Sequence, residues 1–242
     1  MLQHIELQNI LILDIETVSK SPNFESLTPQ MQQLWSQKSA QIQQRKAEDN
    51  RCTDAENYKA SAGIYAEFGK IVCISVGIFT KENQLKLKSF YGHDEAKILV
   101  DFVQTLQQFH RENRYICGHN IREFDIPYIC RRLLVHQITL PDCLTIAGKK
   151  PWQLEHFLDT MNLWKFGDYK HYTSLKLLCS LFNIPSPKDD IDGAAVSISY
   201  WKDDDLNGIK NYCKKDVVAT ARLLMRYQCR PLVEDTQIIY TN

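Results

Sequence analysis

The sequence predicts an α/β fold in which a mixed β-sheet is flanked by helices, and three observations support this class. The nearly continuous apolar run from Asn9 to Glu16 is typical of a strand buried on both faces. Two more strand-like segments, 70–80 and 84–91, are joined by the short polar turn 81–83, which fits a hairpin. Short strands then alternate with amphipathic helices, an order that favours a mixed sheet.

The elements after the hairpin are predicted from the spacing of their apolar residues. A helix is expected from about Glu95 to His110, because apolar residues recur there at helical spacing. Residues 115–118 fit a short strand, and 125–135 fit a helix that tolerates Pro127 in its first turn. The remaining expected elements are a weaker strand near 156–158 and helices at about 173–182 and 203–227.

Residues 20–62 interrupt this pattern and are expected to form a helical insertion within a single domain that spans 1–242. Thr28 and Pro29 are suited to a helix start, with a capping hydroxyl followed by proline at the first helical position. Apolar residues then follow at roughly helical spacing, and the stretch after Gln43 is polar. Either the insertion packs on the edge of the domain, or it forms a flap that guides a substrate.

The composition is that of an ordinary globular protein with zero formal net charge. This neutrality argues slightly against strong non-specific binding to nucleic acid, which relies on phosphate contacts. The eight cysteines include no Cys-x-x-Cys pair, so they are expected to be reduced and structural. We expect no membrane span and no secretory signal, and therefore a cytoplasmic protein.

Acidic residues occur where packing explains them poorly. Asp14 and Glu16 are two residues apart on the first strand, so both carboxylates project from one face. The alternative is a turn-forming Asp beside a solvated Glu. Asp125 opens a predicted helix, where an Asp is also a common cap. Tyr212 and Asp216 are i and i+4 on the last long helix and share one face, beside its apolar stripe.

Together the four acids would form a hard-cation site. Asp216 near a buried stripe needs a partner, which a lysine or a metal ion could supply. Mg²⁺ prefers oxygen ligands, and two such ions about 4 Å apart can stabilise the attacking and leaving oxygens of an in-line displacement. Without metal, repulsion among close carboxylates should raise the pKa of at least one of them.

Three short segments resemble the exonuclease motifs of the DEDD superfamily, which has a ribonuclease H-like fold: Asp14–Thr17, Asn120–Asp125 and Tyr212–Asp216. The chain is more closely similar to bacterial predicted 3′→5′ exonucleases related to the exonuclease domain of family B DNA polymerases. The closer likeness lies in segments 63–77, 164–174 and 186–193.

This resemblance implies roles for the acids. Asp14, Glu16 and Asp216 would hold the metal ion that activates water, and Asp14 would also reach a second ion, assisted by Asp125 through water. Tyr212 would orient the attacking water. The histidine subgroup has His five residues before the last Asp, where this chain has Asn211, so the resemblance is to the tyrosine subgroup. The implied cofactors are two ions of Mg²⁺ or Mn²⁺.

The expected partner is the 3′ end of single-stranded DNA or RNA, with DNA favoured by the polymerase-related family. Loops between the second and third motifs mix lysines and aromatics, which suits single strands, although they also fit ordinary solvated loops. Asp159 fits either an acid near the site or a helix cap. The candidate substrate-binding residues are Thr17, Asn120, Phe124, Asp159, Lys170 and Tyr172.

Two other functions are compatible with the same residues. One is a nucleic-acid-binding or scaffold module that keeps the fold without catalysis, which the intact acids disfavour. The other is a polynucleotidyl transferase on the same fold, against which the combination of Tyr212 and Asp216 argues.

Overall fold

The computed structural model describes residues 1–44, 51–168, 172–185 and 193–241, and it contains one six-stranded mixed sheet. The strands follow the order β5-β4-β1-β2-β3-β6 across the sheet, with β1 near its centre. Helices cover both faces, so the predicted α/β class with a mixed sheet is confirmed. The strands are β1 (Ile10–Ser19), β2 (Gly69–Phe79), β3 (Leu85–Tyr91), β4 (Tyr115–Gly118), β5 (Phe157–Asp159) and β6 (Ile238–Tyr240).

The length of β1 relative to its neighbours shapes the sheet. β1 pairs with antiparallel β2 along nearly its whole length, from Leu11 to Ser19. Parallel β4, by contrast, pairs only with residues Ile10 to Ile12 of β1. The second half of β1 therefore extends beyond the end of β4, and its edge on that side is available to other groups.

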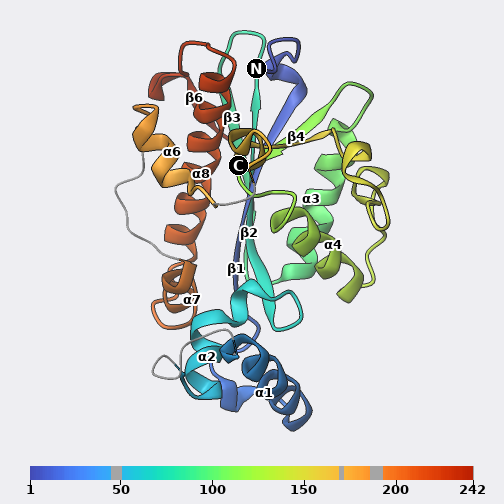
Figure 1. Cartoon of the computed structure of the whole chain (residues 1–242), viewed down its shortest axis with the longest axis vertical. Coiled ribbons are helices and arrows are strands. Elements are labelled where there is room, and N and C mark those ends of the chain that lie inside the picture. The colour runs from blue at the N-terminus through green and yellow to red at the C-terminus, as the bar shows by residue number, and fades with distance from the viewer. Residues whose placement is uncertain (45–50, 169–171, 186–192, 242) are drawn as a thin grey trace.

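The helices form two layers, seen on either side of the sheet in Figure 1. α3 (Glu95–Phe109) and α4 (Asp125–Val135) lie on one side, and α6 (Leu175–Leu181), α7 (Gly193–Trp201) and α8 (Leu206–Tyr227) lie on the other. Because strand side chains alternate, β1 serves both layers. Leu11, Leu13 and Ile15 belong to the core under α3 and α4, whereas Ile10 and Ile12 pack with α8.

A β-bulge lies next to the predicted acids. Glu16 is paired with Cys73, but the next residue, Thr17, is paired with Ile71, so Val72 has no partner on β1. A bulge lets consecutive residues face the same way. Accordingly, Val72 and Cys73 both belong to the cluster packed against α7 and α8.

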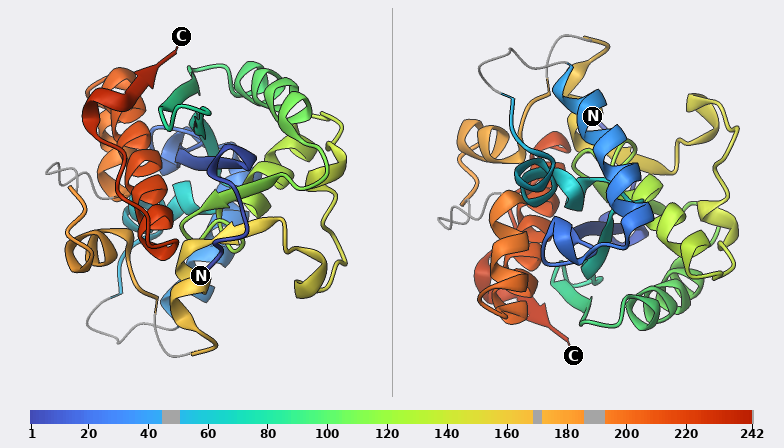
Figure 2. Two further views of the ribbon diagram at one scale, coloured as in Figure 1. Left: turned by 90° about the horizontal axis from the view of Figure 1, so that it is seen from above. Right: turned by 90° about the horizontal axis from the view of Figure 1, so that it is seen from below.

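The segment between β1 and β2 is helical, as predicted for 20–62. It holds α1 (Pro29–Gln43) and α2 (Asp54–Ser61), and the Thr28 hydroxyl caps α1 by accepting a hydrogen bond from the Met31 amide. Trp35 is fully buried against Tyr58, which gives the segment a small aromatic core. α1 and α2 lie at the end of the sheet where β1 finishes, and α1 crosses that end in the view from below (Figures 1 and 2).

Three elements were not expected from sequence: α5 (Thr160–Lys165), α7 and β6. The expected helix at 203–227 begins at Leu206 instead, because Asp205 caps α8 through the Gly208 amide. α7 is rich in residues with high β-propensity, and packing against β1 and α8 overrides that preference. β6 is only three residues long, too short for a periodic signal.

Short 3-10 turns complete the described chain: Leu7–Asn9, Phe24–Ser26, Ala62–Ile64, Asp142–Leu144, Pro151–Gln153 and Asp235–Gln237. Among the described residues, no helix combines the length and the apolar character needed to cross a bilayer.

Candidate active site

The two acids of β1 face the helix that carries the third motif. Asp14 and Glu16 share their strand face with Ile10 and Ile12, which pack against α8. Glu16 is 8% exposed. One carboxylate oxygen of each acid and the sulfur of Cys213 all lie within 4.8 Å of one another. This geometry agrees with the sequence prediction that both carboxylates project from one face of the strand.

α8 presents its third-motif residues through a simple helical arrangement. Ile209, Cys213 and Val217 are fully buried and fix the face of the helix that meets the sheet. Tyr212 and Asp216 lie one turn apart beside this buried stripe, and a side-chain hydrogen bond joins their hydroxyl and carboxylate. The Cys213 thiol donates to the Asp14 carbonyl oxygen at 3.4 Å, which fixes α8 against β1 at the level of the acids.

Asp125 reaches the site from the other helical layer. It is the first residue of α4 and is only 4% exposed. Its carboxylate accepts a hydrogen bond from the Ile15 backbone, on the part of β1 that extends past β4. The early end of β4 therefore gives Asp125 access to β1 between Asp14 and Glu16.

The buried acids repel one another. Burial raises the pKa of the Asp14 carboxyl well above its usual range, and the charges of Glu16, Asp216 and Asp125 raise it further. Burial and the Asp216 charge likewise raise the pKa of Glu16. Burial raises the pKa of Asp125 to about 7 and that of Asp216 to about 6. Such a cluster is costly at neutral pH unless a cation compensates it.

An unsatisfied oxygen of Asp14 indicates that the acid cluster fits a cation. Among the described residues, four buried side-chain N or O atoms lack a hydrogen-bond partner, and two of them belong to the motifs. They are Oδ2 of Asp14 and Oδ1 of Asn120, both oxygen acceptors. Oxygen donors are the ligands that Mg²⁺ and Mn²⁺ prefer, so the donor set suits these metals.

The loop of the second motif is held by Asp159. Its carboxylate accepts hydrogen bonds from the Asn120 and Arg122 amides, both at 3.1 Å. It also caps α5 through the Met161 and Asn162 amides. Asp159 is 2% exposed. Its contacts agree with the helix-cap alternative, and the same carboxylate also holds the loop of the second motif. Asn120 adopts a left-handed conformation with φ 65°, which asparagine tolerates better than most residues.

The other candidate substrate-binding residues lie around this loop. Thr17 forms a hydrogen bond with Tyr128, and the Phe124 ring packs 5.5 Å from the Tyr128 ring. Tyr172 is 69% exposed, and its hydroxyl donates to the carboxylate of Glu123. Lys170 lies outside the described residues. The binding roles of these residues stay predictions.

Cys213 and Cys73 were missed as site residues. The two thiols lie near each other in the cluster packed against α7 and α8, and both are close to the acids. Cys213 follows Tyr212 on the apolar stripe of the last helix, a signal that could have placed it against the first strand. Cys73 had no such signal, because only the pairing of β1 with β2 sets it opposite Glu16. All eight cysteines are free, as expected.

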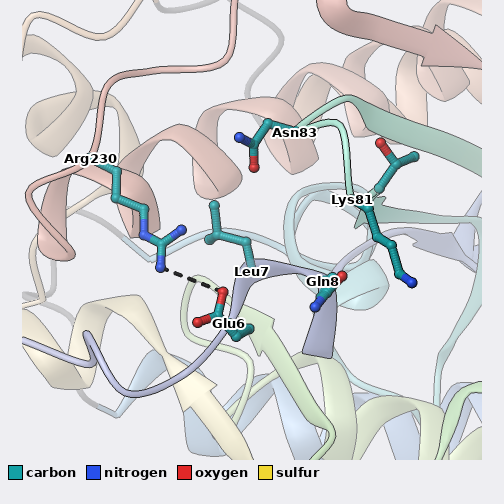
Figure 3. A pocket seen from close by; sticks show the side chains of 7 residues that line it. Glu6, Leu7, Gln8, Lys81, Asn83 and Arg230 are labelled. Atoms are coloured by element: carbon teal, nitrogen blue, oxygen red, sulfur yellow. Dashed lines mark ion pairs between the residues drawn. The ribbon is translucent and has the colours of Figure 1, made fainter.

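A separate pocket of about 210 Å³ lies near the start of β1 (Figure 3). It is lined by Glu6, Leu7, Gln8, Thr80, Lys81, Asn83 and Arg230. Glu6 and Arg230 form an ion pair at 3.9 Å, and both side chains are partly exposed. The pocket lies just before the start of β1, whereas Asp14 and Glu16 lie in the middle of the strand, and none of the four acids lines it.

Comparison with known proteins identifies the family. Residues 64–234 match the model of a family described as "predicted 3'-5' exonuclease related to the exonuclease domain of PolB". The chain belongs to this family. The match covers Asp125, Tyr212 and Asp216 but begins after Asp14 and Glu16, which lie near Cys213 in the structure. No curated protein matches the sequence.

A solved structure shares the fold. It is the family B DNA polymerase from the hyperthermophilic archaeon Pyrobaculum calidifontis, with a TM-score of 0.52 and 16% identity. The likeness covers 91% of this chain but 24% of the polymerase, so the chain spans about a quarter of that protein. The expected ribonuclease H-like fold is thereby confirmed.

Proposed function

We propose that the protein is a two-metal 3′→5′ exonuclease that releases 5′-mononucleotides from single-stranded nucleic acid. The main supporting observation is the convergence of Asp14, Glu16 and Asp216 from two elements far apart in sequence, with an unsatisfied oxygen on Asp14. Membership of a predicted 3′-5′ exonuclease family supports the reaction class.

The four acids would serve as ligands of two metal ions. Asp14, Glu16 and Asp216 would hold one divalent ion, and Asp14 with Asp125 would serve a second. Bound Mg²⁺ or Mn²⁺ supplies charge stabilisation at the phosphate and acidifies water. Asp125 is fixed by the Ile15 backbone and so keeps its carboxylate beside Asp14.

Tyr212 would orient a water molecule and would keep its own proton. Burial and the neighbouring carboxylates raise the pKa of its hydroxyl above the usual range, so the phenol stays neutral. A neutral phenol is a hydrogen-bond donor and acceptor, which suits the orientation of an attacking water. Its bond to Asp216 holds the ring at the acid cluster.

DNA is the favoured substrate over RNA. The chain belongs to a family described as related to the exonuclease domain of PolB, and the similar solved structure is a DNA polymerase. The preference for single strands follows from the exposed aromatic and lysine side chains near the second motif, which can stack on unpaired bases.

The test is digestion of end-labelled single-stranded DNA and RNA by purified protein with Mn²⁺, with Mg²⁺ and with chelator. Metal-dependent stepwise shortening from the 3′ end is expected, and a 3′-terminal phosphate should block it. Equal rates on free and blocked ends, or release from the 5′ end, would overturn the polarity. The matched pair of variants is Asp14→Ala and the exposed control Asp203→Asn, of which only the first should abolish digestion.

A further inference from the structure

The three most exposed large apolar side chains of the described residues lie between the second and third motifs. Phe166 is 79% exposed, Tyr172 69% and Trp152 67%. Exposed apolar side chains scattered singly are normal, but these three all belong to residues 151–172, the part of the chain that contacts the loop of the second motif. Ordinary solvated loops do not require aromatics, whereas stacking on bases does.

Lysines accompany the rings. Nζ of Lys165 lies 4.6 Å from the ring centroid of Tyr172, and Nζ of Lys150 lies 5.5 Å from that of Trp152. An aromatic face beside an ammonium group can meet a base and its phosphate together. We call the two segments that carry these pairs arm one, residues 149–153, and arm two, residues 165–167 with Tyr172.

Both arms are tied to the loop of the second motif. In arm one, the Pro151 carbonyl accepts a hydrogen bond from Nη2 of Arg122 at 3.1 Å. In arm two, the Tyr172 hydroxyl donates to the carboxylate of Glu123. Arg122 and Glu123 are neighbours, so the arms bracket the loop that leads to Asp125. Nucleic acid that contacts both arms would therefore also lie near the loop that precedes Asp125.

Phe166 gives independent support. It ends α5 with φ 47°, a left-handed conformation that is unusual for a bulky residue. Glycine would make this turn without strain. A large, strained and exposed ring at a helix end is therefore better explained by what it contacts than by the turn it makes.

We propose that the two arms are a binding platform for single-stranded nucleic acid upstream of the reacting nucleotide. This inference rests on the proposed function. Trp152, Phe166 and Tyr172 stack on unpaired bases, and Lys150 and Lys165, which lie beside two of these rings, contact phosphates. Because Glu155 and Asp168 lie in the same stretch of chain, the local charge is nearly balanced, so stacking carries more of the affinity than phosphate attraction.

Binding can be measured apart from catalysis. An Asp14→Ala background with chelator prevents cleavage, and fluorescence anisotropy with a labelled single-stranded DNA gives the dissociation constant. The Trp152→Ala/Phe166→Ala variant should bind at least tenfold more weakly, because each stacked base contributes about 1–3 kcal/mol. Tyr240→Ala is the matched control: this ring is 63% exposed and lies beside Lys214, on a different edge of the sheet.

Intrinsic fluorescence gives a second readout. Of the four tryptophans, Trp152 is the exposed one, whereas Trp35 is fully buried. Single-stranded DNA should quench the emission of the Asp14→Ala protein, and Trp152→Phe should remove most of that quenching. The exposed positions of the rings leave the core intact, so equal melting temperatures of the variants and the parent are the control for folding.

Two results would overturn the platform: equal affinity of the double variant and Tyr240→Ala, or a duplex that competes as well as the single strand. Failure of the proposed function looks different. Wild-type protein would then bind through the arms but leave a single strand undigested with Mn²⁺.

Discussion

Replacing Asp125 by Asn in metal-free protein should raise the free energy of unfolding at about pH 8. Burial raises the pKa of this carboxyl from 3.8 to about 7 in the folded protein. A folded-state pKa above the unfolded value gives stability that is fully present below the unfolded pKa. That stability is lost as the pH rises through the folded pKa. Metal-free wild-type protein should therefore become less stable from about pH 4 to about pH 7.

The size of this loss follows from the shift. The difference of about 3 units, at about 1.4 kcal/mol each, gives at most about 4 kcal/mol at pH values above 7. About 3 kcal/mol of it falls between about pH 5 and pH 8. Asn keeps an oxygen that can accept the Ile15 hydrogen bond but carries no charge, so the variant should escape most of this loss.

Urea unfolding followed by circular dichroism, at several pH values with chelator, measures the effect. The exposed control Asp203→Asn should follow the wild-type profile. Adding Mn²⁺ should reverse the order, because the wild type binds metal in the folded state and the variant has lost one carboxylate. Parallel pH profiles of wild type and Asp125→Asn would refute the reasoning, since the buried charge would then not be the source of the pH dependence.

Three further outcomes are expected. Asp14→Ala should reduce turnover to background with saturating Mn²⁺, and substantial residual digestion would argue against the two-metal reading. Tyr212→Phe should lose less activity than Asp216→Ala while calorimetry shows nearly unchanged metal affinity; abolished metal binding in Tyr212→Phe would contradict its positioning role. Asp159→Asn should cost about 1–3 kcal/mol of stability, because one carboxylate oxygen that accepts backbone amides is lost. Hydrogen exchange should then quicken at the Arg122 amide, and unchanged exchange there would exclude Asp159 as the group that holds the motif loop.

Much of the candidate site could be predicted from the local periodicity of strands and helices. The period of two in a strand set Asp14 and Glu16 on one face, and the spacing of i and i+4 set Tyr212 and Asp216 on one helix face. Neither inference needs a partner element, because both follow from backbone geometry alone. The apolar run of 9–16 likewise indicated a central strand, since a strand buried on both faces has little room for polar residues.

Predictions that depend on long-range packing were less complete. The sequence did not decide whether Asp159 is an acid near the site or a helix cap. Its four amide donors come from two segments that only the fold brings together. α7 was missed because four of its nine residues favour strands, whereas in the structure it is a helix that packs against β1 and α8. The proximity of Cys73 to Glu16 depends on the pairing of β1 with β2.

The sequence by itself determined the α/β class, the order of the main strands and helices, and the faces on which the acids lie. Each of these follows from periodicity and turn chemistry within a few residues. The tertiary structure alone decided that β4 ends early enough for Asp125 to reach Ile15, and that the acids are buried together. Burial and mutual repulsion are properties of segments distant in sequence, and they raise the pKa values that make this cluster suited to a divalent cation.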